Sequence, residues 1–264
     1  MLRYGVSNLV FDQVNSDIRS KLITSAQVCD FAPTALYGNW DSMPDMLSSR
    51  PYYGASMEVC ALQSLFFQMQ GASLIQDPQG YEIIEYQVIK LARAAQQSGA
   101  KCLIFGAPGT RKHATPRLEM SEIHSRIKSL ADICFSAGVL LCFEVNSPKF
   151  GCEFLVSNAE LFELLSRLNH PGLGLHLDLG QMSEAGDDLT GLLSCTNFQL
   201  NHLHLSGPDF TLSPERMPHY LDVIAELKRL GKPVDVILEV QHLSESEGAL
   251  LISMSEELAK ACLT

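Results

Sequence analysis

Short apolar runs alternate with longer amphipathic segments along the whole chain, and this alternation is the feature that most limits its possible folds. Eight apolar runs are predicted to be strands: 4–11, 28–33, 57–62, 101–105, 139–144, 173–178, 198–205 and 234–239. Helices are predicted after Asn15 and at 80–99, 119–138, 158–169, 187–195, 215–231 and 247–263. Strands that alternate with helices indicate a parallel sheet with helical crossovers.

Eight such units in 264 residues predict an α/β protein that forms a single (β/α)8 TIM barrel over residues 1–264. Such a barrel commonly needs about 250 residues. Hydrophobic residues make up 46% of the chain, which is ample for one large core. A long loop is predicted within 34–56, where it would shape a pocket at the C-terminal ends of the strands.

Overall charge and composition exclude several classes of partner. The net charge is −11 and the sequence has no run rich in lysine or arginine, so nucleic acid is not an expected partner. No apolar stretch approaches a membrane span of about 20 residues, and the first residues do not resemble a signal peptide. A cytoplasmic protein is expected, with a homodimer as one possible state. The eight cysteines form no CxxC pair and are expected to be reduced core residues.

Four predicted strands end in a side chain that can bind a metal. These side chains are Glu144, Asp178, His204 and Glu239. A charge at the end of a buried strand is costly unless it is paired or coordinated. Each one alone is better explained as a surface residue or a helix cap, but four on consecutive strands predict one divalent ion, either Mn²⁺, Mg²⁺, Co²⁺ or Zn²⁺. Without a cation, the carboxylates would raise one another's pKa.

A site of this kind suggests chemistry next to a carbonyl group. A sugar-like substrate could chelate the ion through its carbonyl and a neighbouring hydroxyl group, and the ion would acidify the carbon-bound proton. Carboxylates on two faces could remove and return that proton, which is isomerisation or epimerisation through a metal-stabilised enediolate. His176 and His202 lie one layer deeper, where a hydrogen-bonded core histidine is as good an interpretation as a ligand.

The order Glu, Asp, His, Glu resembles the xylose isomerase-like TIM barrel superfamily. Within it, the chain is most similar to sugar phosphate isomerase/epimerase-like proteins related to D-tagatose 3-epimerase-type enzymes. Short motifs carry this resemblance: 32–34 (APT), 62–67 (LQSLFF), 105–111 (FGAPGTR), 150–154 (FGCEF) and 202–208 (HLHLSGP).

The resemblance implies a role for each candidate residue. Glu144, Asp178, His204 and Glu239 would bind the metal, and Glu144 and Glu239 would also be the acid/base pair. Arg111 would meet a phosphate or carboxylate of the substrate through its guanidinium fork, unless it is a solvated loop residue. The other substrate-binding candidates are Asn146, Gln63, His176, Gln181 and His219.

Two departures from the epimerase pattern keep other functions open. Gln181 stands where the epimerases have a histidine, and Gly207, Pro208 and Phe210 occupy the region where they have an arginine. Both changes remove groups that hold substrate hydroxyls. The alternatives are a metal-dependent lyase or dehydratase of the inosose dehydratase type and a non-catalytic sugar-binding barrel.

Overall fold

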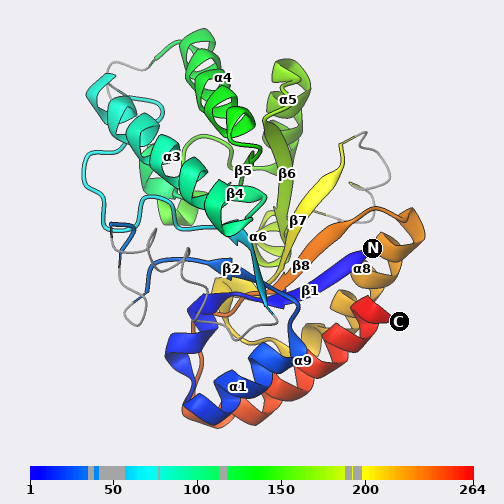
Figure 1. Ribbon diagram of the computed structural model, residues 1–264. Coiled ribbons are helices and arrows are strands. Elements are labelled where there is room, and N and C mark those ends of the chain that lie inside the picture. The colour runs from blue at the N-terminus through cyan, green and yellow to red at the C-terminus, as the bar shows by residue number, and fades with distance from the viewer. Residues whose placement is uncertain (35–38, 42–56, 77, 113–117, 188–191, 193–197) are drawn as a thin grey trace.

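Eight parallel strands pair in chain order and close on themselves, which confirms the (β/α)8 TIM barrel (Figure 1). The computed structural model describes residues 1–34, 39–41, 57–76, 78–112, 118–187, 192 and 198–264. The strands are β1 (Leu2–Val6), β2 (Val28–Phe31), β3 (Glu58–Leu62), β4 (Cys102–Phe105), β5 (Leu140–Phe143), β6 (Leu173–Asp178), β7 (Leu200–Leu205) and β8 (Val234–Leu238).

Helices surround the barrel on its outside (Figure 1). They are α1 (Ser16–Ser25), α3 (Pro78–Ser98), α4 (Met120–Ser136), α5 (Asn158–Leu168), α6 (Leu179–Ala185), α8 (Met217–Leu230) and α9 (Gly248–Leu263). In α3, apolar side chains such as Ile84, Val88 and Leu91 recur at helical spacing and are fully buried. No helix among the described residues has both the length and the apolar character needed to cross a bilayer.

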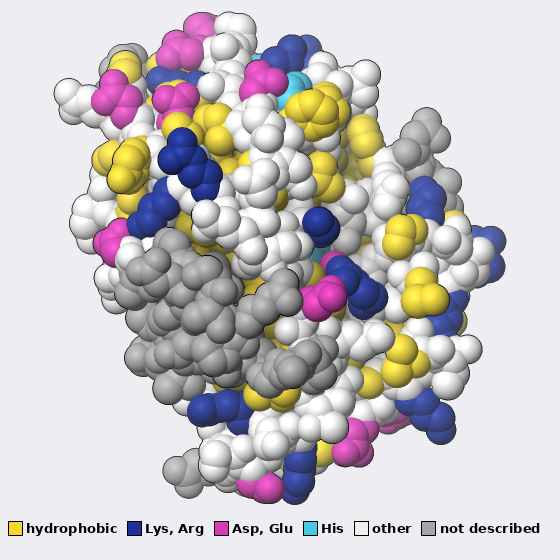
Figure 2. Space-filling model, in the orientation of Figure 1, with side chains coloured by type: hydrophobic (Ala, Val, Ile, Leu, Met, Phe, Trp, Pro, Cys, Tyr) yellow, Lys and Arg dark blue, Asp and Glu magenta, His cyan; other side chains and the backbone are white. Residues whose placement is uncertain are grey.

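The buried apolar residues form two clusters. The larger one fills the space between the strands and the helices. The smaller one joins strand residues only, including Cys60, Cys102, Cys142 and Ile237, which places it inside the barrel. The seven cysteines in the described part of the chain are buried and form no disulfide with one another, as expected; Cys195 lies outside the described residues. On the face shown in Figure 2, basic and acidic side chains are scattered among one another.

The first predicted strand differs from the structure. The strand predicted at 4–11 ends at Val6, and Asn8–Gln13 form a 3₁₀ helix in which the Ser7 hydroxyl accepts from the Leu9 amide. That helix still buries Val10 and Phe11. The apolar residues of this run are therefore in the core, but they lie on a helix and not on a strand. Helix α5 begins at Asn158, as predicted, with Ser157 as its N-cap.

Helix α6 was not predicted. It begins directly after Asp178, whose side chain accepts from the Gln181 amide and so caps it. The helix predicted at 187–195 lies almost entirely outside the described residues, as does most of the loop predicted within 34–56.

Candidate metal centre and active site

Strands β5 to β8 bring the four predicted ligands to one end of the barrel. Asp178 and His204 are paired in register on β6 and β7, and Glu144 and Glu239 directly follow β5 and β8. All four are buried, with 7% of Glu144 exposed and at most 3% of each of the others. This is the C-terminal end of the strands, where the active sites of such barrels lie.

His204 is the centre of this group. Its Nδ1 atom lies 2.9 Å from Oε2 of Glu239 and 3.6 Å from Oδ2 of Asp178. One donor atom from each of these three residues lies within 4.8 Å of the other two. Nδ1 makes no well-directed hydrogen bond although it is buried. A nitrogen with a free position beside two carboxylates fits a divalent cation.

Asp30 on β2 holds His204 from the other side, and the sequence analysis missed it. Its carboxylate accepts from Nε2 of His204 at 2.6 Å and from Nε2 of His202 at 2.7 Å. These bonds leave Nδ1 of His204 as the nitrogen that faces the acidic group, an arrangement typical of residues that support a metal ligand. A charged residue inside the apolar run 28–33 was the available signal.

Opposing electrostatic effects shift the pKa values of this pair. Burial raises the pKa of Asp30, but His202 and His204 outweigh it and hold that pKa below its ordinary value. Burial lowers the pKa of His204, but Glu239, Asp178 and Asp30 raise it well above the ordinary value. Without a cation, the imidazolium of His204 therefore balances part of the negative charge.

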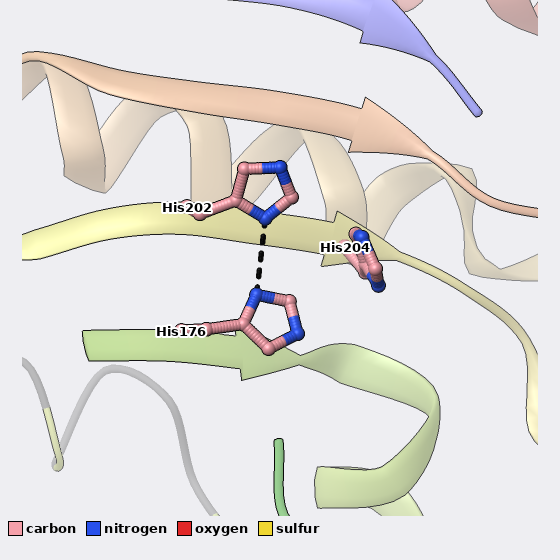
Figure 3. Close-up of side chains that lie close together, drawn as sticks. All are labelled: His176, His202 and His204. Atoms are coloured by element: carbon pink, nitrogen blue, oxygen red, sulfur yellow. Dashed lines mark hydrogen bonds between the residues drawn. The ribbon is translucent and has the colours of Figure 1, made fainter. Parts of the chain in front are cut away.

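His176 and His202 form a second layer beneath this group. Their Nδ1 atoms are 3.0 Å apart, and Figure 3 shows both rings beside His204. The three histidines have donor atoms close enough for a metal, but hydrogen bonds already use both nitrogens of His202 and one nitrogen each of His176 and His204. Nε2 of His176 has no hydrogen-bond partner and lies 3.8 Å from Oε2 of Glu144. The free nitrogens of His176 and His204 therefore both face carboxylates.

Glu144 lies at the edge of the ligand group, and Asn146 and Arg111 hold its side chain in place. The Asn146 amide donates to its Oε1 atom at 2.8 Å, and Arg111 donates to the Asn146 side-chain oxygen. Burial, together with the charges of Asp178 and Glu239, raises the pKa of Glu144 to about 8. Gly106 packs against this carboxylate, since a Cβ atom there would lie 2.5 Å from Oε2 of Glu144.

Arg111 is fully buried and also donates to the Phe154 carbonyl oxygen at 3.3 Å. It is therefore not a solvated loop residue. In this structure it contacts Asn146 and does not line the cavity, and contact with a substrate anion stays a prediction.

Asp178 is fixed by groups from α6 and from the residue that follows β7. The Ser206 hydroxyl lies 2.8 Å from both of its carboxylate oxygens, and the Gln181 amide donates to Oδ1 at 2.7 Å. The Gln181 side chain accepts from the Ser147 amide at 3.1 Å, which ties α6 to the loop after β5. Ser206 is a further residue that the sequence analysis did not single out.

A cavity of about 370 Å³ opens above these strand ends. Of the predicted residues, Glu144, Glu239, Asn146 and Gln63 line it, and Gln63 also donates to the Ser7 hydroxyl at 2.9 Å. His219 is exposed on α8 and does not line it. The rest of the lining is Ser64, Gly106, Pro108, Phe150, Asp209, Phe210, Gln241 and His242.

The sequence profile of the family described as "Xylose isomerase-like TIM barrel" matches residues 73–253. No curated protein sequence gives a significant match. Solved structures are similar over almost their whole length. D-psicose 3-epimerase from Clostridium cellulolyticum H10 is 16% identical with a TM-score of 0.66, and 99% of this chain and 96% of that chain are covered.

Two further structures share the fold at similar identity. The 3-keto-D-glucoside 4-epimerase from E. coli is 13% identical with a TM-score of 0.72, covering 99% of this chain and all of that one. A protein from Bacillus anthracis described as a probable 3-DHS dehydratase is 14% identical with a TM-score of 0.65, covering 99% of both chains. At these identities the likeness establishes the fold.

Proposed function

Because the chain belongs to the family of xylose isomerase-like TIM barrels, we propose that it is a metal-dependent isomerase or epimerase of a small sugar or related hydroxy-carbonyl compound. The observation that carries the proposal is the buried group of Asp178, His204 and Glu239. Of this group Glu239 lines the cavity, together with Glu144. The epimerases among the similar structures support the reaction class.

Each residue of the group has a task in this proposal. Asp178, Nδ1 of His204 and Glu239 would hold the ion, with Glu144 completing the set. When bound, a divalent ion supplies a Lewis acid that polarises the substrate carbonyl and acidifies the neighbouring carbon. Asp30 and Ser206 orient His204 and Asp178 so that their donor atoms face one point.

Glu144 and Glu239 are the proposed acid/base pair. Both line the cavity, so both can reach a substrate there. Asn146 holds one oxygen of Glu144, and burial keeps the pKa of Glu144 near 8, so this carboxyl group carries a proton at neutral pH before a cation binds. Glu239 lies against His204. Two carboxyl groups in different surroundings can take the opposite roles that proton removal and return require.

A lyase or dehydratase is the second candidate. It begins with the same proton removal beside a carbonyl and differs in which group then leaves. The similar structure described as a probable dehydratase supports this second candidate.

Metal content tests the site. After incubation with Mn²⁺ and desalting, the protein is expected to retain about one ion per chain, and Asp178→Asn and His204→Ala should lower that content. Asp235→Asn is the control, because Asp235 is a β8 carboxylate paired with Arg3 outside the ligand group. Equal metal content in all four proteins would contradict the site.

Proton exchange tests the reaction. Incubation of the Mn²⁺-loaded protein with ketoses in D₂O should place deuterium beside the carbonyl, and NMR measures it. Glu144→Gln and Glu239→Gln should each abolish this exchange. Exchange that persists in both variants would remove them as the acid/base pair, and elimination products in place of epimers would favour the lyase.

A further inference from the structure

Two aromatic side chains form one wall of the cavity, on the loops that follow β5 and β7. Phe150 and Phe210 both line it, and their ring centroids are 6.4 Å apart at an interplanar angle of 40°. Phe150 is 37% exposed, which is high for a large apolar residue. None of the metal-site contacts uses either ring, so the proposed acid/base chemistry leaves them without a task.

Lys149 joins the two loops that carry these rings. Its ammonium group lies 4.8 Å from the centre of the Phe150 ring and 2.6 Å from Oδ1 of Asp209. It also pairs with Glu184 of α6 at 2.5 Å. Phe150 and Phe210 are the residues next to Lys149 and Asp209, so the ion pair links the two loops directly beside the two rings.

The backbone of the second loop is also held in an unusual conformation. Asp209 and Phe210 have φ angles of 53° and 57°, although neither is glycine. The Phe210 carbonyl accepts from the Gln241 amide at 2.8 Å, which ties the loop to the segment after β8. Left-handed backbone at non-glycine residues is uncommon and concentrates at ligand sites, where surrounding contacts maintain it.

The cavity is therefore polar on one side and aromatic on the other. Glu144 and Glu239 supply carboxylates at the strand ends, and the two rings stand at the loops. None of the described residues that line it is lysine or arginine, since Arg111 lies beneath Asn146 and Lys149 is paired with two carboxylates. A phosphate in this lining would meet acidic groups without a matching guanidinium or ammonium group.

We infer that Phe150 and Phe210 are specificity-determining residues that bind the apolar face of an uncharged hydroxy-carbonyl substrate. The polar edge of that substrate faces Glu144 and Glu239, so the inference rests on the proposed function. C–H groups carry a partial positive charge and pack on the negative face of an aromatic ring. The apolar face is either the C–H face of a sugar ring or an aryl substituent.

Ligand binding to the Mg²⁺-loaded protein tests this inference, with saturation-transfer NMR titrations as the readout. The probes are dihydroxyacetone, which lacks an apolar face, D-fructose, D-fructose 6-phosphate and 2-hydroxyacetophenone. Phe150→Leu and Phe210→Leu keep apolar volume but remove the rings. Each should weaken binding of D-fructose, 2-hydroxyacetophenone or both by about two- to tenfold, while the Kd of dihydroxyacetone stays constant.

Phe135→Leu is the matched control, because Phe135 is 56% exposed on α4 and does not line the cavity. It should leave every Kd unchanged. A loss of affinity for D-fructose identifies the apolar face as that of a sugar ring, and a loss for 2-hydroxyacetophenone identifies it as an aryl group. Unchanged affinities in the Phe150→Leu/Phe210→Leu double variant, or an equal loss for dihydroxyacetone, would overturn the inference. Tighter binding of D-fructose 6-phosphate than of D-fructose would contradict the inference that the substrate is uncharged.

The same samples separate this inference from the proposed function. Deuterium exchange in D₂O reports the reaction, and the titrations report the aromatic wall. If binding depends on the rings but no probe exchanges deuterium, the proposed reaction is contradicted and the role of the two rings in binding is supported. If exchange occurs but binding does not depend on the rings, the proposed reaction is supported and the role of the two rings is contradicted.

Discussion

Replacing Asp30 with asparagine is the sharpest test of how this site is built. Asp30 is fully buried and accepts hydrogen bonds from Nε2 of both His202 and His204. An asparagine side chain has nearly the same shape but only one acceptor oxygen, and its amide group would face the second N–H. In the cation-bound state, where Nδ1 of His204 carries no proton, either one imidazole loses its partner, or His204 moves its remaining proton to Nδ1, the atom proposed to bind the metal.

The Asp30→Asn substitution should strongly lower both the unfolding free energy and the metal affinity. Removing one partner of a buried, paired charge costs about 3–5 kcal/mol of unfolding free energy. For a chain of this size that corresponds to a fall in Tm of roughly 6–20 °C, at about 2–4 °C per kcal/mol. Loss of a group that orients a metal ligand typically lowers metal affinity by about 10- to 100-fold.

Urea denaturation followed by circular dichroism measures the first quantity, and calorimetric Mn²⁺ titration at a temperature where the variant is folded measures the second. Asp235→Asn is the matched control, because its carboxylate also lies on a barrel strand but pairs with the partly exposed Arg3. The control should lose about 1 kcal/mol or less and keep its Mn²⁺ affinity. If Asp30→Asn binds Mn²⁺ as tightly as the control, Asp30 does not orient His204 for a metal.

Two other substitutions probe the support of Glu144. Gly106→Ala would place a Cβ atom 2.5 Å from Oε2 of Glu144 and displace that carboxylate, so deuterium exchange should fall while Mn²⁺ content persists; normal exchange would contradict the geometry. Arg111→Lys should lower the unfolding free energy by roughly 2–3 kcal/mol, because the buried fork that holds Asn146 is lost. Unchanged stability together with a selective loss of affinity for sugar phosphates would instead support the substrate contact that the sequence predicts for Arg111.

The architecture could be predicted from the sequence because it depends on repeating patterns. Eight apolar runs separated by amphipathic helices leave few alternatives to a closed parallel barrel. The errors occurred where a local contact decides the conformation. Ser7 ends β1 by capping a 3₁₀ helix, and Asp178 caps α6, although a short polar segment after a strand gives little helical signal.

The ends of β5 to β8 were predictable for the same reason. In a parallel barrel all strand ends meet on one side, so the positions of Glu144, Asp178, His204 and Glu239 along their strands were enough to bring them together. The sequence thus determined the barrel and the set of residues that could bind a metal.

Only the tertiary structure decided what surrounds that set. Asp30 contacts His202 and His204 across 172 and 174 residues of chain, and no local pattern specifies such a pair. The sequence also left the positions of the loop residues undecided: Arg111 lies buried against Asn146, whereas Phe210, which has a positive φ angle, lines the cavity. Strand periodicity fixes the face on which a side chain lies, but the closure of the barrel and the conformations of its loops determine which atoms meet.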